Sequence, residues 1–445
     1  MRATAGIVET DRGSLQEFAA LESTVRLYCR TFDRVFARAR GAALFDQDGR
    51  RFIDFLSGAS VVNYGHNNPR IKRAVIDYLE DDGVLHSLDL HTTAKLAFLR
   101  KFRDLILTPR GLDYRVQCCG PTGADAVEAA LKLARKVTNR STVVAFSNAY
   151  HGMTLGALAV TANPRKRASA GVPLEHVLRM PFHGRLGAGI DTVQVLRAAL
   201  TRERAAKPGA IIVETVQAEG GINVASPEWL RGLSELASAE GIPLIVDDIQ
   251  VGCGRTSDFF SFERAGIRPD IVCVSKAIGG IGMPMALALI KPELDLWKPG
   301  EHTGTFRGNN LAFVAAAAAL DYWRDDALAR QVAKHGLLMR DRLAAIAARH
   351  PEHCTEVRGI GMIQGLVWRD GQLATAVSRA AFARSLIVET CGPDGEVTKL
   401  LPPLVIGADE LEEGLAILSE AADEVAAQAA LRPAIRQTRQ ATSAP

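Results

Sequence analysis

Three charged residues directly follow runs of β-branched and aliphatic residues that predict buried strands. Glu214 ends the run at 210–214 (AIIVE), Asp247 ends the run at 243–247 (PLIVD), and Lys276 follows the run at 270–275 (DIVCVS). In open parallel sheets, ligands bind at the carboxyl ends of the strands. A lysine and a carboxylate at the same edge of one sheet therefore predict a functional site there.

Lys276 and Asp247 together suit one kind of cofactor chemistry. A lysine that forms a Schiff base with pyridoxal 5'-phosphate needs a carboxylate beside the pyridine nitrogen, because that carboxylate keeps the nitrogen protonated. Asp247 can supply it. Taken alone, a lysine after a strand is usually just solvated, and it is the presence of Asp247 and of a possible phosphate loop that favours the cofactor.

The cofactor also needs a site for its phosphate. Residues 121–124 (PTGA) form a short glycine-containing loop that leads directly into a predicted helix. The backbone N–H groups and the dipole at a helix N-terminus attract an anion. The alternative is an ordinary helix cap by Thr122, and the loop alone does not distinguish the two. The phosphate-binding pattern of nucleoside-triphosphate enzymes is absent from the sequence.

Between residues 110 and 290, short apolar runs alternate with helical patterns. This alternation predicts parallel βαβ units, which would position the residues described above. Residues 43–56 predict a hairpin that turns near Asp48 and Gly49. An alanine-rich helix is expected at 311–323, strands at 360–368 and 385–390, and a last helix from about 408.

The predicted fold class is α/β, with a large domain around a mainly parallel sheet and a smaller α+β domain built from both chain ends. The predicted boundaries are 1–75 and 326–430 for the two parts of the small domain, 76–325 for the large domain, and 431–445 for a flexible tail.

Composition narrows the possible partners. The 445 residues carry 53 Lys and Arg against 50 Asp and Glu, a net charge of +3, so no nucleic-acid partner is expected. No apolar run approaches the ~20 residues needed to span a bilayer, so no membrane partner is expected. The N-terminal stretch 1–18 has no apolar segment of the kind found in secretion signals, so no such signal is expected. The seven cysteines form no C-x-x-C pair, which favours a reducing, cytoplasmic location.

Several motifs together resemble the class III aminotransferases of pyridoxal phosphate fold type I. They are the stretches 149–152 (AYHG), 213–221 (VETVQAEGG), 245–256 (IVDDIQVGCGRT), 270–276 (DIVCVSK) and 304–309 (GTFRGN). The resemblance covers roughly residues 30–425. Other stretches resemble one branch of that family, the diaminobutyrate–2-oxoglutarate aminotransferases of the ectoine type: 63–69 (NYGHNNP), 120–123 (GPTG), 297–302 (WKPGEH) and 399–404 (KLLPPL).

The resemblance implies roles for the residues around the cofactor ring. Lys276 would bind pyridoxal phosphate covalently and later move the substrate α-proton. Asp247 would pair with the pyridine nitrogen, and Glu214 would support it from behind. Gln250 would reach the phenolic oxygen, and Tyr150 would stack on the ring.

It also implies how the phosphate is held. Thr122, Gly123 and Ala124 would form the phosphate loop, and Thr305 would reach the same phosphate from the neighbouring subunit, which implies a homodimer with shared sites. His151 follows Tyr150 and either touches the cofactor pocket or makes a structural hydrogen bond.

Substrate choice depends on a departure from the wider family. In the wider family, the glutamate that corresponds to Glu219 pairs with an arginine near the C-terminus. This sequence has Lys399 in place of that arginine. The branch resembles this sequence in having lysine there. A lysine is a point charge rather than a bidentate fork, so glutamate cannot be assumed to dock in the usual way. Arg307 is a candidate for contacting the substrate carboxylate or the other subunit, and a surface ion pair is its alternative.

The implied reaction moves an amino group between L-glutamate/2-oxoglutarate and L-aspartate 4-semialdehyde/L-2,4-diaminobutyrate. The alternative is a pyridoxal phosphate enzyme recruited to specialised metabolism with another outcome, such as a lyase, a mutase or carbon–carbon bond formation. A non-catalytic relative is disfavoured because Lys276, Asp247 and Gln250 are all present.

Two further patterns are not expected to carry chemistry. Residues 350–354 (HPEHC) look metal-like, but Pro351 breaks the helical spacing that a zinc pair needs, so a loop and no metal are expected. Cys118 and Cys119 are adjacent and are expected to pack rather than react.

Overall fold

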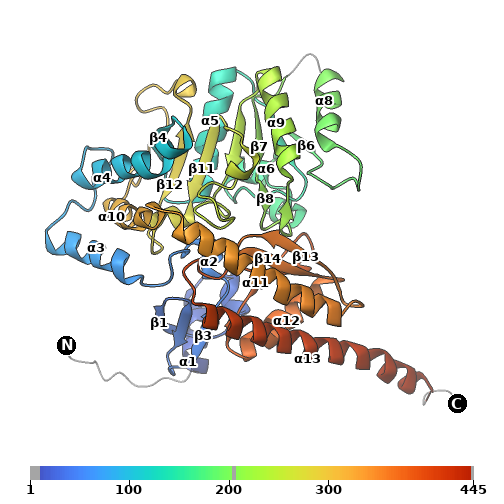
Figure 1. The fold of residues 1–445 in the computed structure, drawn as a ribbon. Helices are drawn as coiled ribbons and strands as arrows, with labels where there is room; N and C mark the ends of the chain where they lie inside the picture. The colour runs from blue at the N-terminus through green and yellow to red at the C-terminus, as the bar shows by residue number, and fades with distance from the viewer. Residues whose placement is uncertain (1–10, 203–206, 442–445) are drawn as a thin grey trace.

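A seven-stranded sheet forms the centre of the computed structural model, which describes residues 11–202 and 207–441 (Figure 1). The strands lie in the order β4-β12-β11-β10-β7-β5-β6. Their bounds are β4 Arg115–Cys118, β5 Val143–Phe146, β6 Val177–Met180, β7 Ala210–Val213, β10 Leu244–Asp247, β11 Ile271–Ser275 and β12 Ala286–Ile290. Only β12 runs antiparallel to its neighbours, so the predicted mainly parallel sheet is confirmed.

Both faces of this sheet are buried, as its continuous apolar runs predict. On one face, Val143, Ile212 and Ile245 pack with helix α5 (Gly123–Thr138). On the other, Val144 and Val246 join a cluster that includes helix α9 (Pro227–Glu240). The remaining large-domain helices are α4 Thr93–Phe102, α6 Leu155–Val160, α7 Pro164–Ala168, α8 Thr192–Arg202 and α10 Asn310–Ala319.

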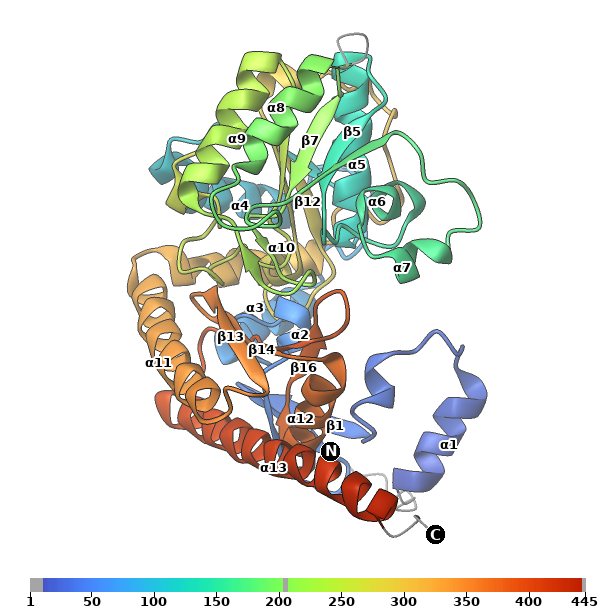
Figure 2. The same cartoon turned by 90° about the vertical axis from the view of Figure 1, so that its right-hand side faces the viewer.

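The small domain combines the two ends of the chain (Figures 1 and 2). Strands β1 (Phe36–Arg40), β2 (Ala43–Asp46) and β3 (Arg51–Asp54) form a meander, and β15 (Leu386–Ile387) pairs in parallel with β3. The hairpin predicted at 43–56 is confirmed, and Gly49 takes the positive φ of +85° that its turn requires.

A second small sheet and three helices complete this domain. The sheet has the order β13-β14-β17-β16, with β13 Cys354–Ile360, β14 Ile363–Trp368, β16 Glu389–Cys391 and β17 Val397–Leu400. The helices are α11 Ala327–Arg349, α12 Gly371–Ala383 and α13 Ala408–Ala441. Helix α13 includes part of the predicted tail, and residues 442–445 lie outside the described residues.

Two further N-terminal helices are α1 (Asp11–Leu21) and α3 (Pro69–Glu80). Figure 2 shows α1 extending away from the small domain. The exact domain boundaries at 75, 325 and 430 stay predictions. In residues 11–202 and 207–441, no helix is long and apolar enough to cross a membrane.

A buried arginine joins the two domains. Arg255 lies in the loop after β10 and is fully buried. Its guanidinium donates to the carbonyls of Met362 (3.1 Å) and Pro402 (2.5 Å) and to the Oδ1 atom of Asn63. Burial lowers the pKa of Arg255 to about 9. One large-domain side chain therefore binds segments from both ends of the chain.

Candidate active site

The strand ends meet as the sequence predicts. Strand β10 lies between β7 and β11 in parallel register, so Glu214, Asp247 and Lys276 emerge at the same edge of the sheet. They line a cavity of about 310 Å³. The cavity is also lined by Thr122, Gly123, Ala124, Tyr150, His151, Gly152, Met153, Val216, Glu219, Ile249, Gln250 and Val251. Ten of the thirteen predicted site residues are thereby brought together.

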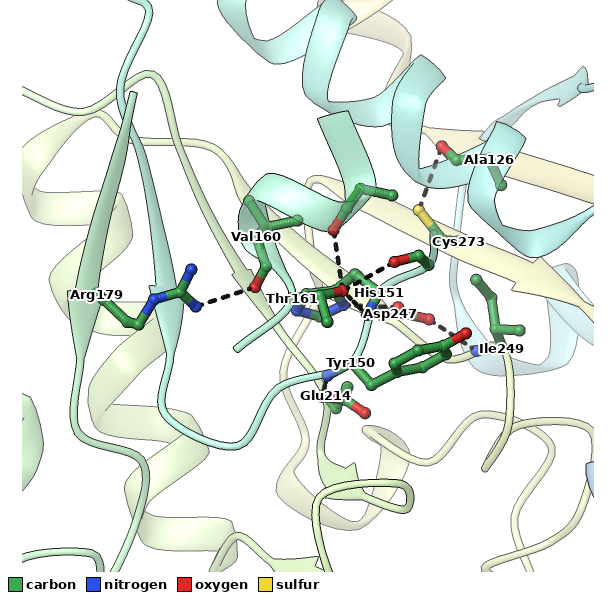
Figure 3. A network of polar contacts seen from close by, with 12 residues as sticks. Ala126, Tyr150, His151, Val160, Thr161, Arg179, Glu214, Asp247, Ile249 and Cys273 are labelled. Carbon is green, nitrogen blue, oxygen red and sulfur yellow. Dashed lines mark hydrogen bonds and ion pairs between the residues drawn. The ribbon is translucent and has the colours of Figure 1, made fainter. Parts of the chain in front are cut away.

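Asp247 is held by two donors (Figure 3). Its Oδ2 atom lies 2.7 Å from Nδ1 of the buried His151, and its Oδ1 atom accepts from the backbone N–H of Ile249 at 3.2 Å. An ionised carboxylate only accepts hydrogen bonds, so His151 carries its proton on Nδ1 when Asp247 is ionised. The backbone N–H of His151 donates to Thr161 Oγ1 at 2.9 Å, which fixes the histidine in turn.

Glu214 lies behind Asp247 and accepts from the backbone N–H of Tyr150 at 3.0 Å (Figure 3). Burial raises the pKa of Glu214 well above its usual range, and the negative charge of Asp247 adds to the rise. Glu214 thus favours its neutral form, and its hydrogen bond positions the backbone from which the Tyr150 ring projects.

Lys276 begins the 3₁₀ turn Lys276–Gly279 with a φ of +56°. A lysine in this left-handed region is strained, and such strain concentrates at functional positions. Burial lowers the pKa of Lys276 to about 8, although the nearby Glu219 carboxylate opposes the shift. A substantial fraction of this amine is therefore neutral near physiological pH.

The phosphate loop opens helix α5 at the same cavity. Thr122 occupies the N-cap position, and both its backbone N–H and its hydroxyl donate to Asp125 Oδ2, at 3.4 and 3.2 Å. A Cβ atom at Gly123 would lie 2.9 Å from Ile249, so only glycine fits without a shift. Thr122 both caps the helix and lines the cavity, so the two alternatives for this loop are compatible.

Lys399 is fully buried beside the cavity and contacts three oxygen atoms. Its Nζ atom lies 2.5 Å from Glu219 Oε1, 3.1 Å from Glu389 Oε1 and 3.3 Å from Gln250 Oε1. Burial raises the pKa of Glu219, but the Lys399 and Lys276 ammonium groups outweigh burial and lower it to about 2. Burial by itself lowers the pKa of Lys399, but the Glu219 and Glu389 carboxylates outweigh burial and raise that pKa well above its usual range.

Two predicted residues lie elsewhere. Arg307 pairs with Asp89 and donates to the His302 carbonyl at 3.0 Å, so it forms the ion pair that was its alternative. Thr305 is exposed, and its carbonyl oxygen lies 3.0 Å from His86 Nε2. Within one subunit, neither residue lines the cavity of Lys276.

The metal-like run at 350–354 follows the end of α11 at Arg349. His350 Nε2 lies 2.6 Å from Asp423 Oδ1. Within the part of the chain that the structure describes, no group of three or more His, Cys, Asp or Glu side chains is placed to hold a metal ion.

Glu389 is a residue of the site that the sequence did not lead us to expect. It begins β16, is buried, and lines a second cavity of about 590 Å³ that shares Tyr150 and Glu219 with the first. Its signal in the sequence was a charged residue inside the apolar run 385–390 (SLIVET). A carboxylate in a buried strand requires a partner, and that requirement could have marked it.

A lysine after one strand, a carboxylate after its neighbour and a helix N-terminus at the same cavity define the class of pyridoxal phosphate-dependent enzymes. Comparison with known proteins gives the family. Residues 28–422 match the family described as "Aminotransferase class-III", and the chain belongs to it.

The chain is 54% identical to "Diaminobutyrate--2-oxoglutarate transaminase" of Streptomyces anulatus, over 93% of this chain and 99% of the relative. It is 54% identical to the protein of the same name from Nocardia farcinica, over 92% and 94%. The ornithine aminotransferase of Toxoplasma gondii, in a structure described as showing partial occupancy of PLP at the active site, matches with a TM-score of 0.84 and 25% identity, over 95% of this chain and 96% of that one.

The protein is therefore a pyridoxal phosphate-dependent aminotransferase. The described residues fit this cofactor, because the cavity of about 310 Å³ brings together an amine with a lowered pKa, a buried carboxylate and the N-terminus of α5. Nothing in these comparisons favours the lyase, mutase or carbon–carbon bond-forming alternative.

Proposed function

We propose that the enzyme transfers an amino group from L-glutamate to L-aspartate 4-semialdehyde, giving 2-oxoglutarate and L-2,4-diaminobutyrate. The observation that carries the proposal is the buried Lys399 in contact with Glu219, because the resemblance to the diaminobutyrate branch implies lysine rather than arginine at this position. The 54% identity to two transaminases of that name supports it.

When bound, pyridoxal phosphate withdraws electrons from the carbon that bears the transferred amino group. Lys276 would hold the cofactor in the resting enzyme, and its Nζ atom would later take and return the proton of that carbon. The lowered pKa of Lys276 supports both tasks, because each needs a neutral amine.

Other residues hold the cofactor. Asp247, oriented by His151, would hold the pyridine nitrogen, and Tyr150 would lie against the ring. The backbone N–H groups of Gly123 and Ala124 would hold the phosphate at the start of α5, where the helix dipole favours an anion.

Glu219 and Lys399 form the substrate gate. With the pair closed, its two charges neutralise each other beside the cavity. The side-chain carboxylate of a glutamate substrate can replace Glu219 on Lys399. L-Aspartate 4-semialdehyde has no side-chain carboxylate, so it can bind without displacing Glu219. Gln250 is the third group on Lys399 and keeps the ammonium oriented in either state.

The same proposal includes a homodimer. Thr305 lies in a loop that packs on residues 84–90, where Val84, Leu85, Leu88 and Leu90 are exposed beside the exposed Phe306. Such a group of exposed apolar side chains is typical of an interface. A second copy packed here would bring Thr305 of the partner subunit towards the phosphate loop. Sedimentation velocity tests this, and a monomer at all concentrations would contradict it.

The first experiment is the visible absorption spectrum of the purified holoenzyme before and after addition of L-2,4-diaminobutyrate. The band of the lysine-linked cofactor should convert to that of the aminated cofactor and return with 2-oxoglutarate. Lys276→Ala should lack the lysine-linked band. A band that neither diaminobutyrate nor glutamate changes would reject the transaminase reaction on these substrates.

A further inference from the structure

Lys399 carries one positive charge and meets two carboxylates, the buried Glu389 and the half-buried Glu219. Glu219 lies 2.5 Å and Glu389 lies 3.1 Å from its Nζ atom. Lys276 is a second ammonium group that acts on both carboxylates, but it is also the residue proposed to bind the cofactor, so in the holoenzyme Lys399 alone would face the two of them. The cluster therefore holds an excess carboxylate, and buried carboxylates require a cation or hydrogen-bond donors.

Glu389 is the carboxylate with free capacity. Its contact with Lys399 lacks the geometry of a hydrogen bond, whereas that of Glu219 has it. Burial raises the pKa of Glu389 despite the opposing Lys399 ammonium, and the Glu219 carboxylate adds to the rise. A second ammonium group near Glu389 would lower the pKa of this carboxyl group again and donate the hydrogen bond that it lacks.

Glu389 also lies at a defined place relative to the reacting lysine. Lys276 lines the inner cavity, Glu389 lines the outer one, and Tyr150 and Glu219 line both. The two cavities therefore adjoin at Tyr150 and Glu219, with Lys276 lining one and Glu389 the other. Tyr28 lines the same outer cavity as Glu389.

The outer cavity contains cations as well. Arg165, Lys166 and Arg179 line it, and Lys166 Nζ lies 4.4 Å from the centre of the Tyr150 ring. A cavity lined by both acidic and basic groups matches a free amino acid group, which carries an ammonium and a carboxylate on one carbon.

We propose that Glu389 binds the non-reacting α-ammonium group of the diamino acid and is a specificity-determining residue for that substrate. This inference rests on the proposed function. In L-2,4-diaminobutyrate the transferred amine is on C4, so the α-ammonium on C2 remains and needs a partner. Glutamate has a single ammonium group, which is the one transferred, so Glu389 has no such group to bind in the glutamate half-reaction.

The test uses two amine donors that differ only in this group. L-2,4-Diaminobutyrate and 4-aminobutyrate have the same chain and carboxylate, but 4-aminobutyrate lacks the α-ammonium. The kcat/KM for each, and for glutamate, is measured with the holoenzyme, with Glu389→Gln and with the control Glu356→Gln. Glu356 is exposed on β13 and lines neither cavity of the site.

Glu389→Gln should lower kcat/KM for diaminobutyrate by about 10- to 100-fold, mainly through KM, because a hydrogen bond to a charged group is lost. The losses with 4-aminobutyrate and glutamate, which reflect only the contact of Glu389 with Lys399, should be clearly smaller, so the ratio of kcat/KM for diaminobutyrate to that for 4-aminobutyrate should fall by about tenfold or more. Glu356→Gln should change none of the kcat/KM values.

Equal losses with all three donors would overturn the inference, since Glu389 would then only support Lys399. An unchanged preference for diaminobutyrate would overturn it as well. If Glu389→Gln does not retain the cofactor, Glu389→Asp keeps the charge at a shorter reach and should lower the same preference severalfold, and an unchanged ratio would again reject the role. A wild-type enzyme inert towards diaminobutyrate would instead reject the proposed function, and this inference with it.

Discussion

His151 Nδ1 lies 2.7 Å from Asp247 Oδ2, and both side chains are buried. The two residues come from different loops of the large domain, after β5 and at the end of β10. Asp247 Oδ1 also accepts a hydrogen bond from the backbone N–H of Ile249. Because both carboxylate oxygens have a partner, the carboxylate is held in one orientation before any cofactor binds. The histidine is thus a positioning residue.

Removing this contact should weaken cofactor binding. His151→Leu is expected to raise the Kd for pyridoxal phosphate about tenfold or more, because a hydrogen bond to a charged group contributes about 1.5–3 kcal/mol. Fluorescence titration of the apoenzyme measures it. His151→Asn keeps a donor near the Nδ1 position and should lose much less. Equal losses in the two variants would show that ring packing, not the hydrogen bond, is what matters.

The lowered pKa of Lys276 predicts a pH dependence of cofactor attachment. Only the neutral amine reacts, so the rate constant for attachment to the apoenzyme should rise with pH through a midpoint near 8, well below the ordinary value of 10.5. Stopped-flow absorbance at several pH values gives the midpoint. Glu219→Gln removes a charge that raises this pKa and should move the midpoint lower. A midpoint at or above 10 would contradict the burial of Lys276.

Lys399→Met should destabilise the fold, because Glu219 and Glu389 would lose their shared cation. The free energy of unfolding is expected to fall by about 3–5 kcal/mol at neutral pH, as for other buried ion pairs from which one partner is removed. Urea denaturation of the apoenzyme measures it. The control Lys207→Met breaks only a surface pair with Glu240 and should cost no more than about 1 kcal/mol.

The same variant should respond to pH in a defined direction. Without Lys399, the two buried carboxylates have pKa values raised by burial, so the folded variant binds protons that its unfolded chain does not. Its stability should therefore increase as the pH falls from 8 towards 5, and the gap to the wild type should narrow. A gap that widens over this range would refute the ion-pair explanation.

Arg255→Lys tests the junction between the domains. Lysine lacks the planar fork that reaches Met362, Pro402 and Asn63 together, and each buried acceptor left without a donor costs about 1–3 kcal/mol. Thermal unfolding should show a clearly lower Tm. Arg342→Lys alters only an exposed pair with Glu412 and should shift stability by less than about 1 kcal/mol. Similar Tm values for the two variants would reject the special role of Arg255.

The sequence predicts those features that local pattern encodes. Runs such as 143–146 become strand β5 because their residues are apolar on both faces, and Asp247 and Lys276 meet because adjacent parallel strands end at one edge. The antiparallel direction of β12 is not readable, since a five-residue apolar run looks the same in either direction.

Contacts between distant segments are also not encoded locally. His151 and Asp247 are 96 residues apart, and nothing near either residue specifies the other. The pairing of Glu219 with Lys399 is expected only through the family resemblance, and the structure adds Glu389 to that pair. The role of Arg307 stays a prediction, because its contact with Asp89 is that of a single subunit.

The pairing of β3 with β15 has a consequence for the order of events during synthesis. Arg50, the residue before β3, donates to the carbonyl of Ala383, which lies 333 residues further along the chain and shortly before β15. At about 5–20 residues per second, the ribosome needs roughly 20 s to a minute to deliver that segment. Until then the nascent chain carries an open strand edge and an Arg255 that still lacks Met362 and Pro402. The large domain can begin to assemble during synthesis, whereas β3 keeps an open edge until residues 386–387 have left the ribosome.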